Sequence, residues 1–154
     1  MDLITFQEMV ERNFSYLTNE FGFSMVRKHS SESFGNALLE YQTEKTFLRI
    51  ALDRSQVLID VKPLSSTDDS WFGLPSLVEF LAPDFDETAY IFPEKWDDYD
   101  DMIEWQIERV ARILRQYCEP ILSGKFSKWK KVDKMRLKKI RREYKDITGE
   151  DYPL

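Results

Sequence analysis

Apolar residues near the start of the chain recur at steps of three and four. They are Phe6, Val10, Phe14, Leu17 and Phe21. Such spacing places side chains on one face of a helix and predicts a helix over residues 5–20. The run Thr5-Phe6-Gln7-Glu8 matches a capping box, in which two side chains satisfy free backbone N–H groups. Gly22 follows where a left-handed residue ends many helices.

Four shorter segments come next, with the residue types and alternation of half-buried strands. They span residues 23–30, 37–43, 46–52 and 56–64. Turn-forming residues separate them at 33–36 and at 53–55. Because parallel strands need long crossover connections, these short links predict a four-stranded antiparallel meander.

The second half of the chain reads as helical. LPSLVEFL predicts a short helix with Pro75 in its first turn and Pro83 beyond its end. After irregular residues 84–96, a long helix is predicted over about 98–122, broken at Gly124. Its buried stripe would be Ile103, Ile107, Val110, Leu114, Tyr117 and Ile121. A last helix, over about 126–147, would bury Trp129, Val132, Leu137, Ile140 and Tyr144 and end at Gly149.

These elements predict an α+β fold in a single domain, residues 1–154. The meander would be packed on one face by the N-terminal helix and two or three C-terminal helices. A chain of 154 residues with 42% hydrophobic residues can bury one core. Its apolar runs fall short of a membrane span, and its N-terminus has no basic flank or continuous apolar stretch. We therefore expect a cytoplasmic protein that does not bind membranes.

Charge is strongly segregated along the chain. Residues 68–108 hold thirteen acidic residues and one base, Lys95, whereas residues 109–154 hold fourteen bases and six acids. Such segregation creates local potentials that steer partners and does not determine the fold.

The stretch FPEKWDDYDDMIEW, residues 92–105, sets six carboxylates among four aromatic residues. One or two acids suffice to cap a helix and complement its dipole. The excess favours a surface for a basic protein, because Tyr and Trp are enriched at interfaces and acids speed the approach of a cationic partner. The candidate residues are Asp84, Asp86, Glu87, Tyr90, Glu94, Trp96, Asp97, Asp98, Tyr99, Asp100 and Asp101. The alternative is that the tryptophans are core residues and the acids only keep a monomer soluble.

Motifs for catalysis are missing from the sequence. There is no glycine-rich phosphate loop, G-x-S-x-G, H-E-x-x-H or paired cysteine motif. His29 and Cys118 are single, and Cys118 falls beside the apolar stripe, as a buried cysteine does. Glu104 and Glu108 lie one helical turn apart, but Glu108 also stands four residues before Arg112, which predicts a helical ion pair. We expect no enzyme, no metal and no organic cofactor.

The basic residues between Lys130 and Lys145 would occupy most of the last helix outside its apolar stripe. Such a face binds nucleic acid in a salt-sensitive manner. However, no base-reading fold is evident and the acidic region would repel a polyanion, so nucleic-acid binding is the less favoured interpretation. The basic face would instead be solvated, or paired with the acidic region in the same molecule or in a second copy, which leaves a homo-oligomer open.

Three stretches carry a resemblance: LRIALDRSQVLIDVKPL, WFGLPSLVEFLAP and IERVARILRQYCEPILSGKF. Over roughly residues 36–130 the chain resembles a family of small uncharacterised bacterial α+β proteins, loosely similar to immunity proteins, which neutralise toxins inside the producing cell. The resemblance rests on core and turn residues and implies no catalytic residue. Together with the charge pattern it implies a protein-binding module, of the kind that inhibits a basic toxin or nuclease by occlusion. The alternatives are a nucleic-acid-associated module and a self-associating structural protein.

Overall fold

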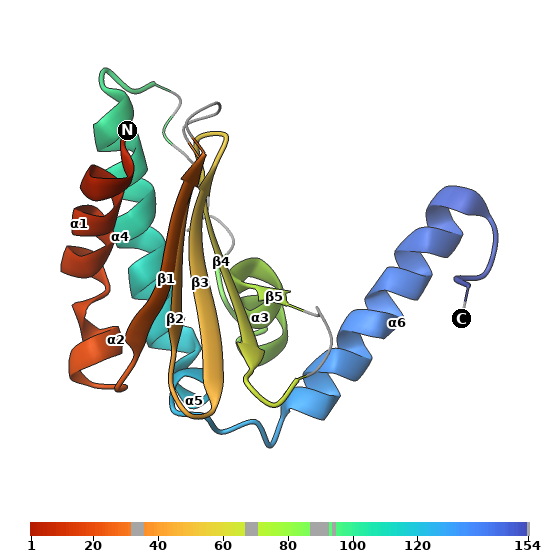
Figure 1. The fold of residues 1–154 in the computed structure, drawn as a ribbon. Helices are drawn as coiled ribbons and strands as arrows, with labels where there is room; N and C mark the ends of the chain where they lie inside the picture. The colour runs from red at the N-terminus through yellow and green to blue at the C-terminus, as the bar shows by residue number, and fades with distance from the viewer. Residues whose placement is uncertain (32–35, 67–70, 87–92, 94, 154) are drawn as a thin grey trace.

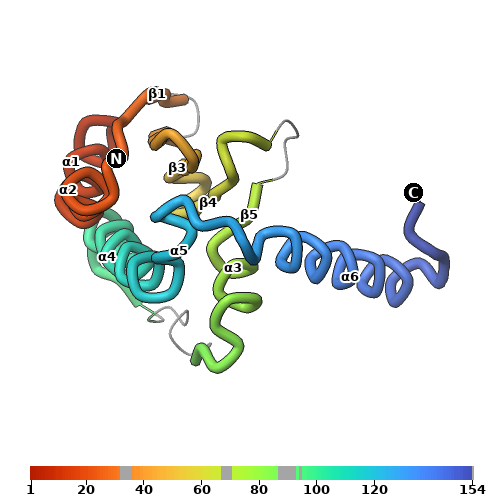
Figure 2. The backbone as a smooth tube through the Cα atoms, turned by 90° about the horizontal axis from the view of Figure 1, so that it is seen from below, coloured from red at the N-terminus to blue at the C-terminus, as the bar shows by residue number. Residues whose placement is uncertain are grey.

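The structure is a computed structural model that describes residues 1–31, 36–66, 71–86, 93 and 95–153. It has an α+β fold with a five-stranded antiparallel sheet in the order β1-β2-β3-β4-β5. Figure 1 shows α1 and α4 side by side against one face of this sheet, and the view from below in Figure 2 agrees. Every second residue of the central strands is buried and faces these helices, whereas the residues between them lie on the more accessible face of the sheet.

The predicted N-terminal helix is two helices, α1 (Leu3–Asn13) and α2 (Ser15–Asn19). Phe14 separates them, with φ −106° and ψ 23°. The predicted capping box at Thr5 is wrong: Asp2 is the N-cap, and its carboxylate accepts from the Thr5 N–H at 2.7 Å. Phe6, Val10, Phe14 and Leu17 are all buried, as their spacing predicted.

The four predicted strands are β1 (Ser24–Ser31), β2 (Asn36–Gln42), β3 (Thr46–Asp53) and β4 (Gln56–Pro63). A fifth, β5 (Phe72–Gly73), was not predicted, because two residues are too few to show alternation. Within the described residues it pairs with Asp60 and Val61 of β4. Of the predicted turn at 33–36, Asn36 begins β2, and residues 33–35 lie outside the described residues.

The short helix α3 (Leu74–Leu81) has Pro75 in its first turn, as predicted. The predicted long helix is divided into α4 (Tyr99–Tyr117) and α5 (Glu119–Leu122). Pro120 accounts for the break, because it lacks an N–H and clashes with the carbonyl four residues before it. Ile103, Ile107 and Leu114 are buried, whereas Val110 and Tyr117 are only half-buried.

The last helix, α6 (Trp129–Thr148), ends at Gly149 in a left-handed conformation, as predicted. The prediction of its buried stripe was wrong. Val132 is its one buried residue, Leu137 is 38% exposed, and Trp129, Ile140 and Tyr144 are half-buried. The reason is visible in Figure 1, where α6 starts beside α3 and then projects away from the body. We call this projecting helix the arm.

Candidate protein-binding surface

Four aspartates surround the first turn of α4. Asp98 is the N-cap, and its Oδ1 accepts from the N–H groups of Asp100 at 2.7 Å and Asp101 at 3.2 Å. Asp97, Asp98 and Asp101 are exposed and Asp100 is half-buried. Within the described part of the chain, none of the four forms an ion pair. One aspartate therefore caps the helix, and the structure gives the other three no partner of opposite charge.

Two aromatic side chains accompany these aspartates. The Tyr99 side chain at the first position of α4 is 42% exposed. Trp96 is half-buried and lies against Trp105, with 5.5 Å between ring centroids. The Trp96 indole nitrogen is buried and has no hydrogen-bond acceptor among the described residues. Trp96 thus holds the segment before α4 against the helix, while Tyr99 faces solvent among the acids. We call Trp96–Asp101 the acidic-aromatic face.

The other candidate residues are not joined to this face by any described contact. Asp84 and Asp86 follow α3 and are exposed, and Asp86 has a polar or electrostatic partner. Glu87, Tyr90 and Glu94 lie outside the described residues. The structure therefore brings together only the part of the candidate set that adjoins α4.

Acidic side chains further along α4 and just after α2 are neutralised by bases. Glu104 pairs with Arg12 of α1, and Arg115 of α4 pairs with Glu20 at 2.5 Å. The expected Glu108–Arg112 pair does not form among the described residues. Because these pairs lie beyond the first turn, they do not involve the aspartates of the acidic-aromatic face.

A groove between α3 and α4 was missed by the sequence reasoning. It has a volume of about 210 Å³ and is floored by β4 where β5 no longer covers that strand. Its lining includes Val57, Ile59, Leu74, Trp105 and Val110, with Arg109 beside Trp105. Trp105 therefore contacts both this groove and Trp96 of the acidic-aromatic face.

Gln106 closes the upper edge of the groove. Its side-chain oxygen accepts from the Val57 N–H, and its amide nitrogen donates to the Ser55 carbonyl, both at 2.9 Å. The side chain thus takes the place of a neighbouring strand where β5 is too short. A glutamine between the apolar residues Ile103 and Ile107 was a signal that could have revealed this buried polar contact.

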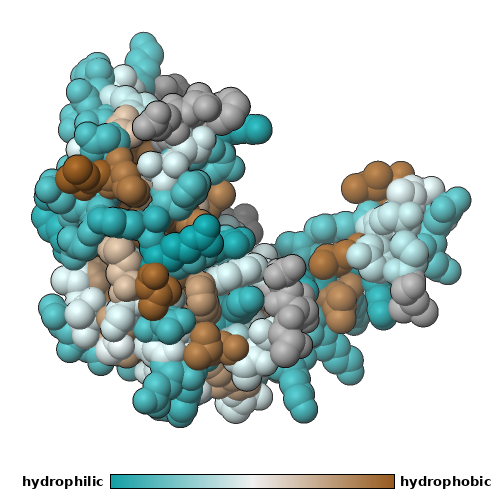
Figure 3. All heavy atoms as spheres, in the orientation of Figure 1, coloured by the Kyte–Doolittle hydropathy of each residue, from teal (hydrophilic) through white to brown (hydrophobic). Residues whose placement is uncertain are grey.

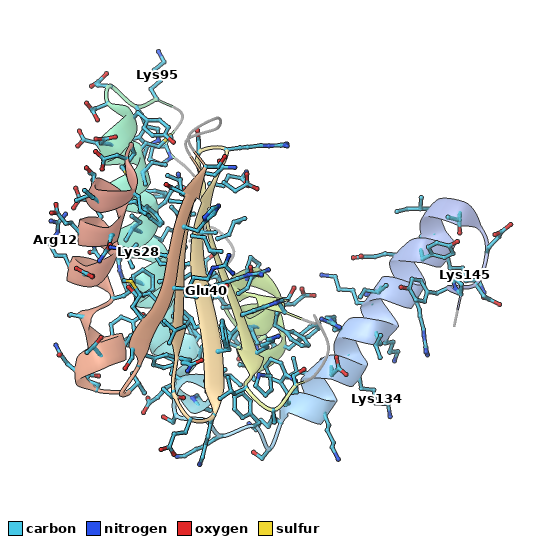
Figure 4. The ribbon with its side chains drawn as sticks, viewed as in Figure 1. Arg12, Lys28, Glu40, Lys95, Lys134 and Lys145 are labelled. Carbon is cyan, nitrogen blue, oxygen red and sulfur yellow. The ribbon has the colours of Figure 1, made fainter. Side chains whose placement is uncertain are left out.

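The arm carries the opposite charge. Most of its bases are exposed: Lys130, Lys131, Lys134, Lys138, Arg141, Arg142 and Lys145. Lys145 lies 3.5 Å from Asp151, and Lys139 bonds to Glu79 of α3 at 2.8 Å, a hydrogen bond that raises the pKa of Lys139. Figure 4 shows Lys134 and Lys145 on the arm and Lys95 at the far end of the molecule, just before α4. The predicted pairing of basic and acidic segments within one molecule is therefore formed by Lys139 and Glu79. Within the described residues it does not extend to the aspartates of the acidic-aromatic face.

The single cysteine and histidine are not arranged as a catalytic pair. Cys118 is 0% exposed, and burial raises the pKa of its thiol to about 12. His29 is exposed on β1, at the edge of the sheet. Among the described residues, no group of three or more His, Cys, Asp or Glu is placed to hold a metal ion. No helix in the described ranges is long and apolar enough to cross a membrane.

Comparison with known proteins adds no relative. No protein-family model, no curated protein and no solved structure matches the chain. The resemblance over residues 36–130 stays a prediction. What can be said of function rests on the residues described above.

Proposed function

We propose that this chain is a protein-binding module, and that its acidic-aromatic face binds a basic protein. One observation carries the proposal: three aspartates around an exposed tyrosine form no ion pair within the described structure. Clustered like charges repel one another. Binding of a cationic partner would therefore offset an electrostatic repulsion that the fold itself does not offset.

The aspartates and the aromatic residues would contribute to binding in different ways. Exposed aspartates act at a distance, raise the association rate and lose their effect as salt increases. Tyr99 offers rigid area with a polar tip, which is typical of residues that dominate affinity. Trp96 is held against Trp105 and would present the rim of a pre-formed surface. We therefore propose that the aspartates mainly raise the association rate and that Tyr99 mainly slows dissociation.

The partner class that fits best is a toxin or nuclease with a cationic cleft, and the mode is occlusion of that cleft. The charge of the acidic-aromatic face supports this assignment. No catalytic step is required of the chain. The first place to look for the partner is the product of the neighbouring gene, because an immunity gene must travel with its toxin.

The test uses two variants with the same change in net charge. The first replaces Asp97, Asp98, Asp100 and Asp101 by asparagine, and the second replaces Glu8, Glu44, Glu119 and Glu150 by glutamine. All four residues of the control set are exposed and form no ion pair within the described structure. Kinetics are measured against the neighbouring gene product at low and at physiological salt.

Association should slow about tenfold or more in the first variant and lose its salt dependence, while the control should keep both. Tyr99→Ala should speed dissociation by a factor equivalent to about 2 kcal/mol. Equal losses in both charge variants would show that net charge alone matters and would remove the acidic-aromatic face from the proposal. No binding by the wild-type chain would reject the assigned partner.

A second candidate function is nucleic-acid association through the arm. The observation that favours it is the distance in Figure 1 between the arm and the acidic end of α4, which weakens the expected repulsion of a polyanion. We still expect only weak, non-specific binding at physiological salt, because no base-reading element accompanies the arm. Submicromolar binding to a defined sequence, abolished by reversing Lys130, Lys131, Lys134 and Lys138, would replace the first proposal by this one.

A further inference from the structure

The arm is a long helix that packs on the body through side chains of its first half. A helix of 20 residues is about 30 Å long. Its contacts with the body involve its first turns: Trp129 meets Phe72 and Phe126, Arg136 donates to the Trp71 carbonyl, and Lys139 pairs with Glu79. An isolated helix is marginal in water and gains most of its stability from packing. The distal arm therefore has a surface that is suited to contact with another molecule.

That surface is both basic and partly apolar. Leu137 is 38% exposed, Met135 39% and Ile147 84%. Figure 3 shows hydrophobic side chains among hydrophilic ones along the arm. A phosphate backbone would use the bases and leave these apolar side chains in water. A protein surface with acids and aromatic rings would use both.

The chain itself carries such a surface. The acidic-aromatic face has unpaired aspartates with Tyr99 exposed among them and Trp96 at its rim. On the arm, Lys130, Lys134 and Lys138 follow one another at steps of four and form no ion pair within the described structure. The start of α4 and the arm lie on opposite sides of the molecule in Figures 1 and 2, so the two surfaces do not meet within one copy in this structure.

We infer that the arm of one copy docks on the acidic-aromatic face of a second copy. Charge complementarity selects this occupant: two arms would repel each other, and so would two acidic faces. This inference rests on the proposed function, because it assigns a second ligand to the same face. The contact is heterologous, because it joins two different surfaces. A closed assembly would be either a pair in which each copy docks its arm on the other, or a ring of copies. A basic foreign partner would then compete with the arm for one site.

The test is a charge exchange in the full-length chain. One variant carries Asp97→Lys, Asp100→Lys and Asp101→Lys, which leaves the N-cap Asp98 in place and makes both surfaces basic. The other carries Lys130→Glu, Lys134→Glu and Lys138→Glu, which makes both surfaces acidic. A control carries Lys28→Glu, Lys45→Glu and Lys125→Glu, which are exposed lysines outside the arm. Sedimentation velocity over a concentration series, at about 50 and 500 mM salt, reports association, and circular dichroism reports folding.

The wild-type chain and the control should associate at low salt, and this association should weaken at least tenfold at high salt. Each exchanged variant alone should be monomeric, and an equimolar mixture of the two should associate again. Restoration in the mixture excludes misfolding as the cause of the loss. A wild-type chain that stays monomeric at low salt, an exchanged variant that still associates alone, or a mixture that does not associate would each overturn the inference.

The proposed function is tested separately in the same samples. If the neighbouring gene product binds the wild-type chain and not the lysine variant, while no sample self-associates, the proposed function stands and the docking of the arm fails. If the exchange pattern is found without any foreign binding, the docking of the arm stands and the basic foreign partner fails.

Discussion

Gly124 is held by a backbone constraint and a packing constraint together. Its φ is +74°, and a Cβ added there would lie 2.6 Å from Cδ and 2.9 Å from Cβ of Lys45. Gly22 has nearly the same φ, +72°, but nothing lies within 4 Å of its added Cβ. The pair separates the cost of the left-handed backbone from the cost of a clash.

Gly22→Ala should lower the free energy of unfolding by about 1 kcal/mol, the cost of a left-handed alanine. Gly124→Ala should lower it by about 1–3 kcal/mol more, because the Lys45 stem and the turn between β2 and β3 that carries it must move. Urea unfolding of both variants measures the difference. Equal losses would mean that Lys45 moves aside freely.

Cys118 is a residue whose burial makes stability depend on alkaline pH. Its folded pKa of about 12 exceeds the value of about 8.5 for a thiol in an unfolded chain. The unfolded state therefore loses the proton first as pH rises. The stability is fully present below pH 8.5 and falls by up to about 1.4 kcal/mol per pH unit toward pH 12.

Cys118→Ala should remove this dependence between pH 8 and pH 9, below the range near pH 10 in which tyrosines of the unfolded chain lose their protons and the buried Tyr16 and Tyr41, whose pKa values are also raised by burial, begin to contribute. The measurement is the urea midpoint of both proteins at these two pH values. An equal fall in the variant would assign the alkaline loss to other groups.

Among the elements, the arm combines one anchored side chain with many solvated ones. Val132→Ala should lower the free energy of unfolding by about 1–3 kcal/mol, because Val132 is 3% exposed in the core. Leu137→Ala, on the same helix, should change it by less than about 0.5 kcal/mol in the monomer. Thermal unfolding at high salt compares the two without self-association. A large loss at Leu137 would show that the arm folds back on the body.

The edge of β4 depends on the side chain of one helical residue. Gln106→Leu should leave the buried Val57 N–H without a partner, at a cost of about 1–3 kcal/mol, whereas the carbonyl of the exposed residue Ser55 can bond to water. Gln116→Leu, an exposed position on the same helix, is the control. Hydrogen exchange should show faster exchange of the Val57 amide in the first variant only. Unchanged protection there would mean that another group has replaced the glutamine.

At the scale of the whole molecule, most of the sheet and the position of α3 could be predicted from sequence, because the short links allow few topologies. The division at Cys118 could have been read from Pro120, whereas β5 could not, since its two residues are placed by α3. The exposed stripe of the arm could not be predicted either. An apolar stripe has the same spacing whether its own chain or another molecule covers it.

The candidate site, too, could be predicted from the sequence only in part. The sequence placed an acidic helix start with aromatic residues, and the structure shows Asp98 capping α4 and Tyr99 exposed. Local pattern alone could not show that Glu104 is neutralised by Arg12, 92 positions away, while the first-turn aspartates are not. Binding at the acidic-aromatic face stays a prediction.

Both edges of the sheet are poor templates for another strand. On β1, Arg27, Lys28 and His29 are exposed, and the pairing with β2 shifts between Met25 and Arg27, as in a β-bulge. At the opposite edge, the described part of β5 is two residues long. Beside it, Gln106 forms hydrogen bonds with the backbone groups of Val57 and Ser55 that another strand could otherwise use. Charged, bulged or covered edges discourage fibril-like stacking. Any assembly of native chains should therefore redissolve on adding salt and stay dark with amyloid dyes.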